Sequence, residues 1–516
     1  MTLGLMAFFG RPMTMVSQIL PPFILAVGVG FAVHLLAIAF QLIDKGKTPE
    51  VAIPAALRHS GPAILMSALT TAFGMASFMP SDLMPVRDVG VFVPLGIAIA
   101  AFLALALVPA VLTLVSVKPL GLVSIDRDSE EPPPTERVLI RFAQFGTRHP
   151  YSVVAATLAV LGVAAVAIPT IPPGYNILDW VPEDGPYATG TIFVNESLGG
   201  AGNMEIVVDT GRANGLYEPD SLRRIETLQR YLEANPAEEF RFQKTTSIAD
   251  VVKEIHQALH ENDRAYYATP DDRTLIAQEL LLFENSGSND LEKIVDSGFQ
   301  TARLSVRSTW GSGAEYEPYL EWIEEDARQT FEDATVSVTG LVPILMTSLV
   351  ETEAGMKRSY AVALLTITPL MIILIGSLRG GLSSMVPNLA PMIVVMGLMG
   401  AFDVPFDVFT IMTGSVAIGL AVDDTIHFLH GFYREFERTG DTRGSIARTL
   451  ETTGEALLTT SLVLAIGFSV FLFATMPTLQ TFGLITTLAI LLAFLADILV
   501  APALVTVATR HRTKAD

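Results

Sequence analysis

The sequence predicts a polytopic α-helical membrane protein that carries one α+β domain. Half of its 516 residues are hydrophobic, 17% are charged and the mean hydropathy is +0.47, far from the values of an ordinary soluble protein. The apolar residues form runs of about 20 residues or more, the length that crosses about 30 Å of hydrocarbon. In addition, the amino-terminal part of the chain recurs near its carboxyl terminus at a constant offset of 393 positions.

The repeat is carried by residues that set the shape of the backbone. The matched residues are Gly4, Pro12, His34, Gly74, Gly90 and Pro109 in the first copy and Gly397, Pro405, His427, Gly467, Gly483 and Pro502 in the second. Acidic residues differ between the copies, because Asp423 corresponds to Gly30 and Asp497 corresponds to Ala104. The second copy therefore has acids at two positions where the first has none.

Nine full membrane spans are predicted from the apolar runs. They lie at residues 15–43, 61–80, 88–117, 150–170, 356–378, 385–402, 406–433, 455–475 and 479–508. The opening stretch, Met1 to Phe9, is only half a span and matches the end of a later helix that begins near Met385. We therefore expect the chain to start inside a helix, and this stretch lacks the features of a signal peptide.

These runs divide the chain into six parts. The predicted parts are a remnant of a first membrane repeat at 1–117, a cytoplasmic linker at 118–149, the first helix of a second repeat at 150–170, an α+β domain at 171–355, a five-span bundle at 356–508 and a cytoplasmic tail at 509–516. The linker is indicated by the run Pro132-Pro133-Pro134 and by its mixed charges.

The α+β domain carries the net charge of the protein. Residues 171–355 hold 33 Asp and Glu against 13 Lys and Arg, and the whole chain has a formal charge of -20. Strand-like segments at 204–209 and 336–340 alternate with helical stretches, a pattern that suggests two small α+β units. So acidic a domain is a poor partner for nucleic acid, because phosphate binding depends on Lys and Arg.

The orientation follows from the basic residues near the ends of the spans. With alternating spans, the loops and tails that are rich in Lys and Arg fall on one side, which the positive-inside rule assigns to the cytoplasm. Residues 171–355 then face outward. The predicted location is the inner (plasma) membrane of a bacterial cell, crossed several times, with residues 171–355 in the periplasm.

Asp423 and Asp424 are the strongest candidates for functional residues. They lie within the apolar run SVAIGLAVDDTIHFLHGF, where an ionised carboxylate is costly and usually marks an ion path or a proton relay. In a helix His427 lies on the face of Asp423, four residues on, whereas Asp424 is rotated by about 100°. A buried carboxyl group beside another titratable group can load and release a proton.

Asp497 is the third acid within an apolar run, and it is predicted either to face the same cavity from the last helix or to serve packing alone. His34 matches His427 in the repeat but has no acid beside it, so a packing role is favoured. An alternative for all of these acids is that they join helices through hydrogen bonds only.

Other chemistries find little support in the sequence. The chain has no cysteine, which excludes disulfides and thiol catalysis. No His or carboxylate cluster has metal-ligand spacing, Gln41 stands where a phosphate-binding loop ending at Thr48 needs glycine, and no cofactor is predicted. An intramembrane aspartyl protease needs two carboxylates that face each other, which the neighbours Asp423 and Asp424 cannot do. No enzymatic activity is therefore expected.

Several motifs together resemble the RND superfamily of proton-driven exporters. They are GLAVDDTIHFL, LLTTSLVLAIGF and LVAPAL in the second repeat, with AVGVGFAVHLL and SALTTAFGM as first-repeat versions of the same helices. More narrowly, the chain is similar to the MMPL or hydrophobe/amphiphile-exporter branch, with a sterol-sensing-domain-like bundle. The resemblance covers essentially the whole chain, including porter-like stretches such as TTSIADVVKEIHQALHEND.

The resemblance implies a parallel-repeat bundle with an external porter-like domain at residues 171–355. It implies a transporter, driven by the proton-motive force, that exports lipidic or amphiphilic substrates, with protons, membrane lipids and the substrate as its partners. Asp423 and Asp424 match the relay acids of the family, and His427 matches the histidine that follows them. Together with Asp497 they form the proton relay that we predict.

The sequence departs from the family pattern in two ways. Gly30 and Phe31 stand where many relatives have an acid and an aromatic residue, so the expected relay is single-sided. Moreover, the family pattern has a first helix, a porter domain, a second helix and half of a third before the point that matches Met1. We therefore expect a carboxy-terminal portion of a longer transporter, whose other half lies upstream or on a separate chain. The alternative is a non-transporting, sterol-sensing-like membrane scaffold or an inactive transporter fragment.

Overall fold

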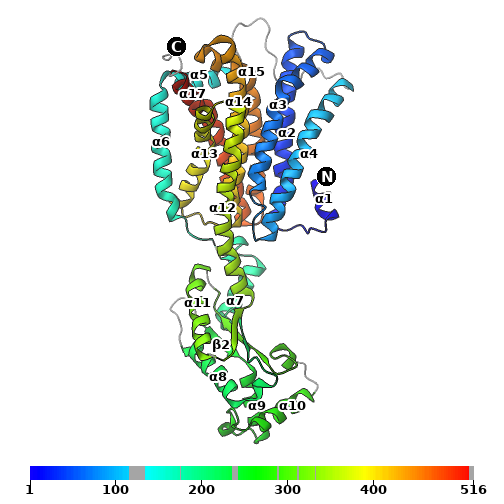
Figure 1. The fold of residues 1–516 in the computed structure, drawn as a ribbon, viewed down its shortest axis with the longest axis vertical. Helices are drawn as coiled ribbons and strands as arrows, with labels where there is room; N and C mark the ends of the chain where they lie inside the picture. The colour runs from blue at the N-terminus through cyan, green and yellow to red at the C-terminus, as the bar shows by residue number, and fades with distance from the viewer. Residues whose placement is uncertain are drawn as a thin grey trace. The chain divides into compact units, whose positions relative to one another are not determined.

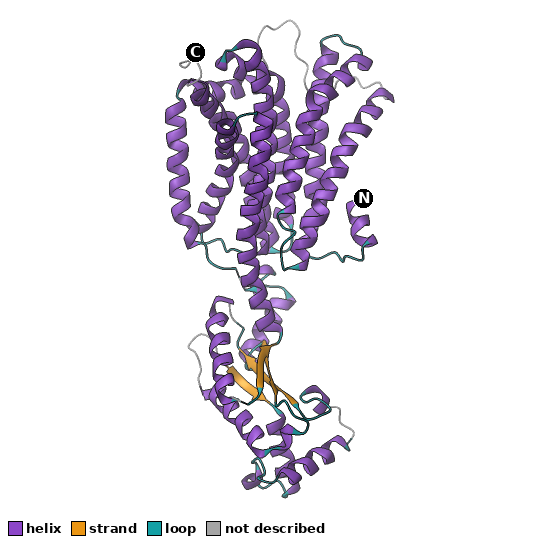
Figure 2. Cartoon of the chain, viewed as in Figure 1, coloured by secondary structure: helices purple, strands orange, loops and turns teal. Residues whose placement is uncertain are grey.

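The computed structural model describes residues 1–114, 134–174, 176–234, 242–286, 290–310, 313–331 and 333–510. The chain divides into two compact units, one made of Met1–Pro172 with Glu351–Asp516 and the other of Pro173–Val350. The described part of the first unit is helical, whereas the second unit contains the strands (Figure 2).

The first unit is a helical bundle (Figure 1). Its α-helices are α1 (Thr2–Phe8), α2 (Leu20–Asp44), α3 (Pro49–Ala76), α4 (Met84–Leu114), α5 (Pro134–Arg148), α6 (Pro150–Ala167), α13 (Leu378–Ala401), α14 (Val408–Thr439), α15 (Thr442–Ser469), α16 (Pro477–Leu495) and α17 (Ala501–Arg510). Short 3-10 helices are η1 (Val16–Ile19), η3 (Ile168–Thr170) and η8 (Val470–Phe473), and η9 (Ala496–Val500) is a π-helix. Helix α12 (Leu341–Ile375) contains residues of both units.

Eight helices of the described residues are long and apolar enough to cross a membrane. They include eight of the nine predicted spans. The exception is the predicted span at 61–80, which forms most of helix α3 but is not among the eight. The polar side chains Ser60, Ser67, Thr70 and Thr71 of α3 are all buried, which explains why this helix is less apolar than the others.

The helix bounds follow the sequence repeat. Helix α3 and helix α15 correspond residue for residue, since α15 begins 393 positions after the start of α3, at Thr442 against Pro49, and ends 393 positions after its end, at Ser469 against Ala76. Likewise α4 begins at Met84 and α16 at Pro477, and α1 ends at Phe8 as α13 ends at Ala401. The first repeat is therefore represented by α1 to α4 and the second by the end of α13 and by α14 to α17.

The two repeats pack against each other through equivalent pairs of helices. Helix α14 packs against α3, and α2 packs against α15. A Cβ atom placed on Gly74 would lie 3.3 Å from the Cα atom of Gly419, and one on Gly467 would lie 3.5 Å from the Cβ atom of Ala26. These are equivalent contacts, and their small residues let the helices approach closely.

Half of the predicted linker at 118–149 is a helix. Residues 134–148 form α5, in which Leu139 and Ala143 are buried. A Cβ atom on Gly146 would lie 2.6 Å from the carbonyl oxygen of Leu499, so α5 packs directly on the bundle. The predicted linker therefore contains a packed helix, because the apolar face of α5 has a partner on the bundle. Its first part, and residues 511–516 of the predicted tail, lie outside the described residues.

The second unit contains one four-stranded antiparallel sheet in the order β2-β3-β1-β4. Its strands are β1 (Gly202–Asp209), β2 (Phe242–Thr246), β3 (Thr301–Ser308) and β4 (Thr335–Thr339). Its α-helices are α7 (Pro186–Ser197), α8 (Pro219–Ala234), α9 (Ile248–Leu259), α10 (Arg273–Glu284) and α11 (Gly313–Thr330). Its 3-10 helices are η4 (Ile177–Trp180), η5 (Gly215–Tyr217), η6 (Arg264–Tyr266) and η7 (Leu291–Lys293). Alternate residues of β1 and β3 are buried. The sequence suggested two small α+β units, whereas the two predicted strands, at 204–209 and 336–340, pair with each other in this single sheet.

Candidate functional site

Helix α14 supports the candidate site and is the most deeply buried helix of the bundle. Its most apolar 18-residue window is entirely buried. Asp407 starts the helix by accepting hydrogen bonds from the backbone amides of Phe409 at 2.9 Å and Thr410 at 2.7 Å. Gly440, with φ at +67°, ends it. The helix packs against α3, α13, α15 and α16, so the polar side chains of its buried part, residues 408–429, lie against other helices.

Three consecutive side chains of α14 point to three different neighbours. Successive residues of a helix are rotated by about 100°, and Asp423 accordingly contacts α3, Asp424 contacts α15, and Thr425 contacts α13 and η9. All three side chains are buried. The segment therefore forms a polar centre that touches four other elements within an apolar bundle.

Asp423 lies between a hydroxyl group and an imidazole ring. The Ser67 hydroxyl of α3 donates a hydrogen bond to Oδ1 of Asp423. The same oxygen lies 3.6 Å from Nε2 of His427, which is too long for a hydrogen bond. The shared helix face that we predicted for Asp423 and His427 is confirmed. The Nε2 atom of His427 has no hydrogen-bond partner in the described part of the chain.

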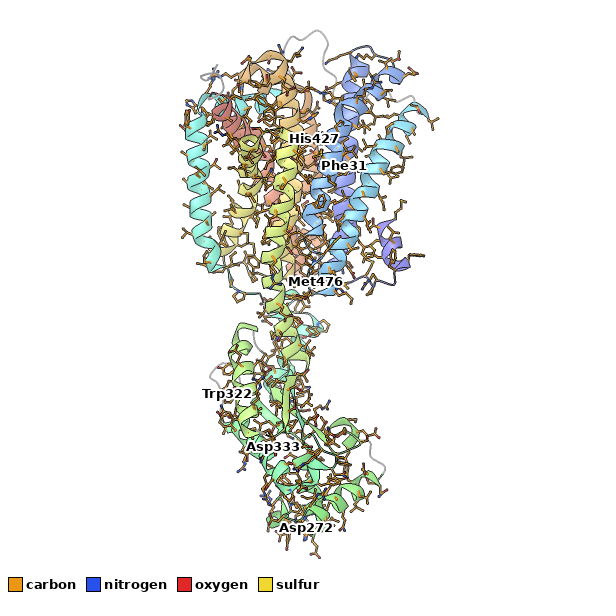
Figure 3. The ribbon with its side chains drawn as sticks, in the orientation of Figure 1. Phe31, Asp272, Trp322, Asp333, His427 and Met476 are labelled. Atoms are coloured by element: carbon orange, nitrogen blue, oxygen red, sulfur yellow. The ribbon has the colours of Figure 1, made fainter. Side chains whose placement is uncertain are left out.

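Asp424 lies beside two hydroxyl groups of α15. Ser461 donates to Oδ2 at 2.6 Å. The Thr460 hydroxyl lies 3.2 Å from Oδ1 and 3.0 Å from the carbonyl oxygen of Leu457, so its one hydrogen serves one of these two acceptors at a time. Phe31, the first-repeat equivalent of Asp424, is fully buried; Figure 3 labels it together with His427 in the bundle. The two repeats therefore have a carboxylate and a phenyl ring at equivalent positions.

Asp497 lies in the π-helix η9 and contacts α14 through Thr425. The Thr425 hydroxyl lies 2.5 Å from Oδ1 of Asp497 and 2.6 Å from Oδ1 of Asn388 on α13. A hydroxyl group has one hydrogen and cannot donate to both oxygens. Either a proton on Asp497 or an Asn388 amide that presents its nitrogen to Thr425 completes this network. Asp497 thus contacts the polar centre through Thr425, from the last membrane-spanning segment of the bundle.

His34 contributes to the centre from the first repeat. Its ring stacks on that of His427, with centroids 3.7 Å apart and 5° between the ring planes. Both histidines are buried, with exposed fractions of 3% and 6%. The sequence favoured a packing role for His34 because no acid is its neighbour in the chain. The structure instead brings it against the histidine that follows Asp423 and Asp424.

Sequence reasoning missed the hydroxyl and amide groups that bind the acids. These residues are Ser67, Thr425, Thr460, Ser461 and Asn388. A usable pattern was present, because Ser67 and Thr460 are equivalent in the repeat. A Cβ atom on Gly30 would lie 3.8 Å from Cγ2 of Thr460. The contact equivalent to that of Ser67 with Asp423 therefore keeps its hydroxyl residue, Thr460 of the second repeat, but lacks the acid, because the first repeat has Gly30.

The structure also gathers three groups that metal ions bind, which spacing along the chain did not suggest. His34, Asp423 and His427 offer ligand atoms that all lie within 4.8 Å of one another. The lone pairs of an imidazole lie in the ring plane, and zinc binds nitrogen at about 2.0–2.1 Å. Because the two rings are stacked, their lone pairs run parallel and do not converge on one ion. This arrangement fits a metal poorly.

The arrangement of the carboxylates also differs from that of an aspartyl protease. Asp423, Asp424 and Asp497 each bind a hydroxyl group, and no hydrogen bond joins two of them among the described residues. A protease dyad needs two carboxyl groups that share one proton directly.

Comparisons with known proteins identify the family. The model of the MMPL family matches residues 5–153 and 237–516. A Methanocaldococcus jannaschii chain named as a membrane protein, MJ1562, is 23% identical over 397 residues, which are 72% of this chain and 95% of that one. A crystal structure of SecDF in the super-membrane-facing form matches the whole chain with a TM-score of 0.54 and 17% identity.

The match to SecDF concerns the fold, and this chain spans 57% of the SecDF chain. The predicted fold class is confirmed by that similarity and by the helical bundle itself. Because the family model covers most of the sequence, the chain belongs to the MMPL family, as a multi-pass membrane protein with an RND-type fold.

Proposed function

We propose that the protein is a transporter driven by the proton-motive force, which exports lipidic or amphiphilic molecules. In this proposal it lies in the bacterial inner membrane, with residues 171–355 on the outer side. One observation carries the proposal: Asp423 and Asp424 are buried on the most enclosed helix of the bundle, and no Lys or Arg pairs with either in the part of the chain that the structure describes. Uncompensated carboxylates at such a place are costly when charged and are suited to binding protons.

The hydroxyl partners suit proton exchange. A Ser or Thr hydroxyl both donates and accepts hydrogen bonds, so it can serve a carboxylate or a protonated carboxyl group. Ser67 and Ser461 occupy this position beside Asp423 and Asp424. Protonation would change which group donates, and with it the contacts of α14 with α3 and α15. The small residues at the contact of Gly74 with Gly419 would let these helices shift.

Two cavities on the bundle are lined mostly by apolar side chains, which favours an apolar substrate. One, of 500 Å³, is lined by residues of α1, α2 and α4, including Leu20, Ile24 and Leu103. Another, of 450 Å³, is lined by residues of α5, α6, α13, α16 and η9, including Val160 and Leu492. Both volumes lie in the range of ligand pockets, about 300–1,000 Å³. An acyl chain or another apolar moiety would fit their chemistry.

A second candidate is a membrane scaffold of the sterol-sensing type that transports nothing. The observation in its favour is that the first repeat has Gly30 and Phe31 where the second has Asp423 and Asp424. Retention of both acids with their hydroxyl partners in the second repeat favours the transporter. The two candidates differ in whether a proton gradient does work through this bundle.

The test is gradient-driven efflux of a fluorescent amphiphile from inverted vesicles that contain the purified protein. We expect efflux that depends on the gradient in the wild type and falls at least tenfold in the Asp423→Asn, Asp424→Asn double variant. Asp88→Asn is the matched control, because it removes a buried carboxylate of α4 that is paired with Arg11 at 3.7 Å. Unchanged efflux in the double variant would exclude the relay, and absence of efflux in the wild type would favour the scaffold.

A further inference from the structure

We propose that His34 and His427 together form a proton-holding site at the junction of the two repeats, with Asp423 as its counter-charge. This inference rests on the proposed function and deepens it, because it makes the relay two-sided. The first repeat contributes an imidazole from α2 where it lacks an acid. Sequence reasoning expected a relay confined to the second repeat.

The geometry supports a shared site. The rings are parallel within 5° and 3.7 Å apart, and Nε2 of both histidines lacks a hydrogen-bond partner within the described ranges. Buried polar atoms are rarely left unsatisfied without a reason. Asp423 Oδ1 lies 3.6 Å from Nε2 of His427. A small approach of these two atoms makes a hydrogen bond along which a proton can pass.

The proton transfer is simple to balance. A proton that arrives on Oδ1 of Asp423 passes to Nε2 of His427, so that an O–H bond breaks and an N–H bond forms. The products are a carboxylate and an imidazolium, which attract each other. Two imidazolium rings 3.7 Å apart would repel strongly in a buried site. The pair therefore takes up at most one proton beyond the one N–H that each neutral ring already carries.

The surroundings leave Asp423 as the nearest counter-charge. The other titratable or charged groups around the pair are His59 from α3, Asp424, His430 and Arg434 from α14, and Asp497 from η9. Helices α13 and α15 contribute neutral Asn388, Thr460 and Ser461. The nearby acids favour a first proton on the pair, and the charge of that proton disfavours a second.

The histidine pair lies between the two repeats, so a proton on it would affect how the repeats pack. His34 and His427 are equivalent residues of the two repeats, and their stack is a direct contact between α2 and α14. An imidazolium drawn toward Asp423 weakens that stack. The close contacts of Gly74 with Gly419 and of Gly467 with Ala26 lie in the helix pairs that surround the histidines. A proton on the pair thus changes the interface between the repeats.

The test uses His34→Phe, which keeps a flat ring for stacking but holds no proton, and His34→Gln as a second variant. His149→Gln, an exposed histidine before α6, is the control. We expect both His34 variants to remain folded, with at least a tenfold loss of efflux or a displaced pH profile of efflux. In wild-type protein carrying ¹⁵N-labelled histidine, the signals of His34 and His427 should titrate together.

The outcomes separate this inference from the proposed function. If Asp423→Asn abolishes efflux while His34→Phe keeps the wild-type rate and pH profile, the shared site is wrong and the transporter proposal stands. If Asp423→Asn has no effect, the proposed function itself fails. Independent titration of the two histidines, or a shift of their signals by Zn²⁺ at stoichiometric concentration, would also overturn the inference.

Discussion

At the scale of residues, the polar centre depends on hydroxyl groups that satisfy buried acids. Asp423 Oδ1 has one hydrogen-bond donor, the Ser67 hydroxyl, among the described residues. Ser67 is fully buried, so water does not replace it readily. Each acid thus depends on a neighbouring helix for its hydrogen bonds, and changes on that helix affect it.

Replacing Ser67 by Ala should destabilise the protein and disturb the relay together. Loss of the Ser67 hydroxyl, the one donor to Asp423 Oδ1 among the described residues, leaves a buried oxygen unsatisfied, at a cost of about 1–3 kcal/mol. The control is Ser77→Ala, because Ser77, the buried residue that directly follows α3, donates to the carbonyl oxygen of Gly74 at 2.6 Å and not to an acid. Unfolding in mixed micelles and gradient-driven efflux measure the two effects. Equal behaviour of the two variants would show that the contact with Asp423 has no particular importance.

At the scale of elements, the contact of α3 with α14 depends on glycine. Gly74→Ala would place a Cβ atom 3.3 Å from the backbone of Gly419, so one helix must move by a few tenths of an ångström. Gly162, on helix α6, has nothing within 4 Å of such an atom apart from its chain neighbours and its own helix backbone. An Ala in a helix is intrinsically favoured over Gly by about 1 kcal/mol. The two glycines therefore make a matched pair.

We expect Gly162→Ala to raise the melting temperature and Gly74→Ala to lower it, since close packing outweighs helix propensity at Gly74. Thermal unfolding of the two purified variants is the measurement. A higher melting temperature for Gly74→Ala would mean that the two helices separate without cost. The packing account of the repeated small residues would then be wrong.

The turn that precedes strand β3 should be sensitive to acid. Desolvation acts to raise the pKa of Asp296, but backbone amides of Thr301, Gln300 and Gly298 donate to its carboxylate and lower the pKa overall. A lowered pKa means that the folded state binds the proton less readily than the unfolded state. The stabilisation is present above the ordinary value of 3.8 and is lost as the pH falls below it.

Hydrogen exchange of residues 290–310, corrected for intrinsic exchange rates, measures this effect. The pH range of about 3 to 6 spans the ordinary carboxyl pKa. We expect protection at β3 to fall at the acid end in the wild type. Asp296→Ala should have lower protection throughout and little pH dependence. The exposed Asp290 of the same segment provides a control, since its replacement should leave the pH dependence intact.

At the scale of the whole molecule, the second unit has a core of its own. Residues 173–350 form one compact unit, with a complete four-stranded sheet and buried side chains from both β1 and α8 such as Ile206, Leu222 and Leu228. Units with their own core generally fold alone. Its strong acidic charge favours solubility.

Expressed by itself, the segment 173–350 should therefore be soluble and unfold in one cooperative transition. Circular dichroism during heating and analytical ultracentrifugation measure the transition and the state of association. Non-cooperative melting, with exposed apolar surface detected by dye binding, would show that this unit needs the bundle for its stability.

The sequence alone determined the class of this protein, its repeat and the acids of its polar centre. Length and continuity of apolar runs fix membrane helices because the backbone must satisfy its own hydrogen bonds in lipid. Their spacing of four positions placed Asp423 and His427 on one face of a helix. Membership of the MMPL family was also within reach, from motifs such as GLAVDDTIHFL.

Only the tertiary structure decided what meets those acids. Ser67 lies 356 positions from Asp423, and His34 and His427 are in contact only because two repeats pack against each other. The same holds for the single sheet, whose strands β1 and β3 are distant in sequence, and for α5, whose partner lies near the carboxyl terminus. Periodicity reports the face that a residue occupies on its own helix or strand. Which other element covers that face depends on packing between distant segments.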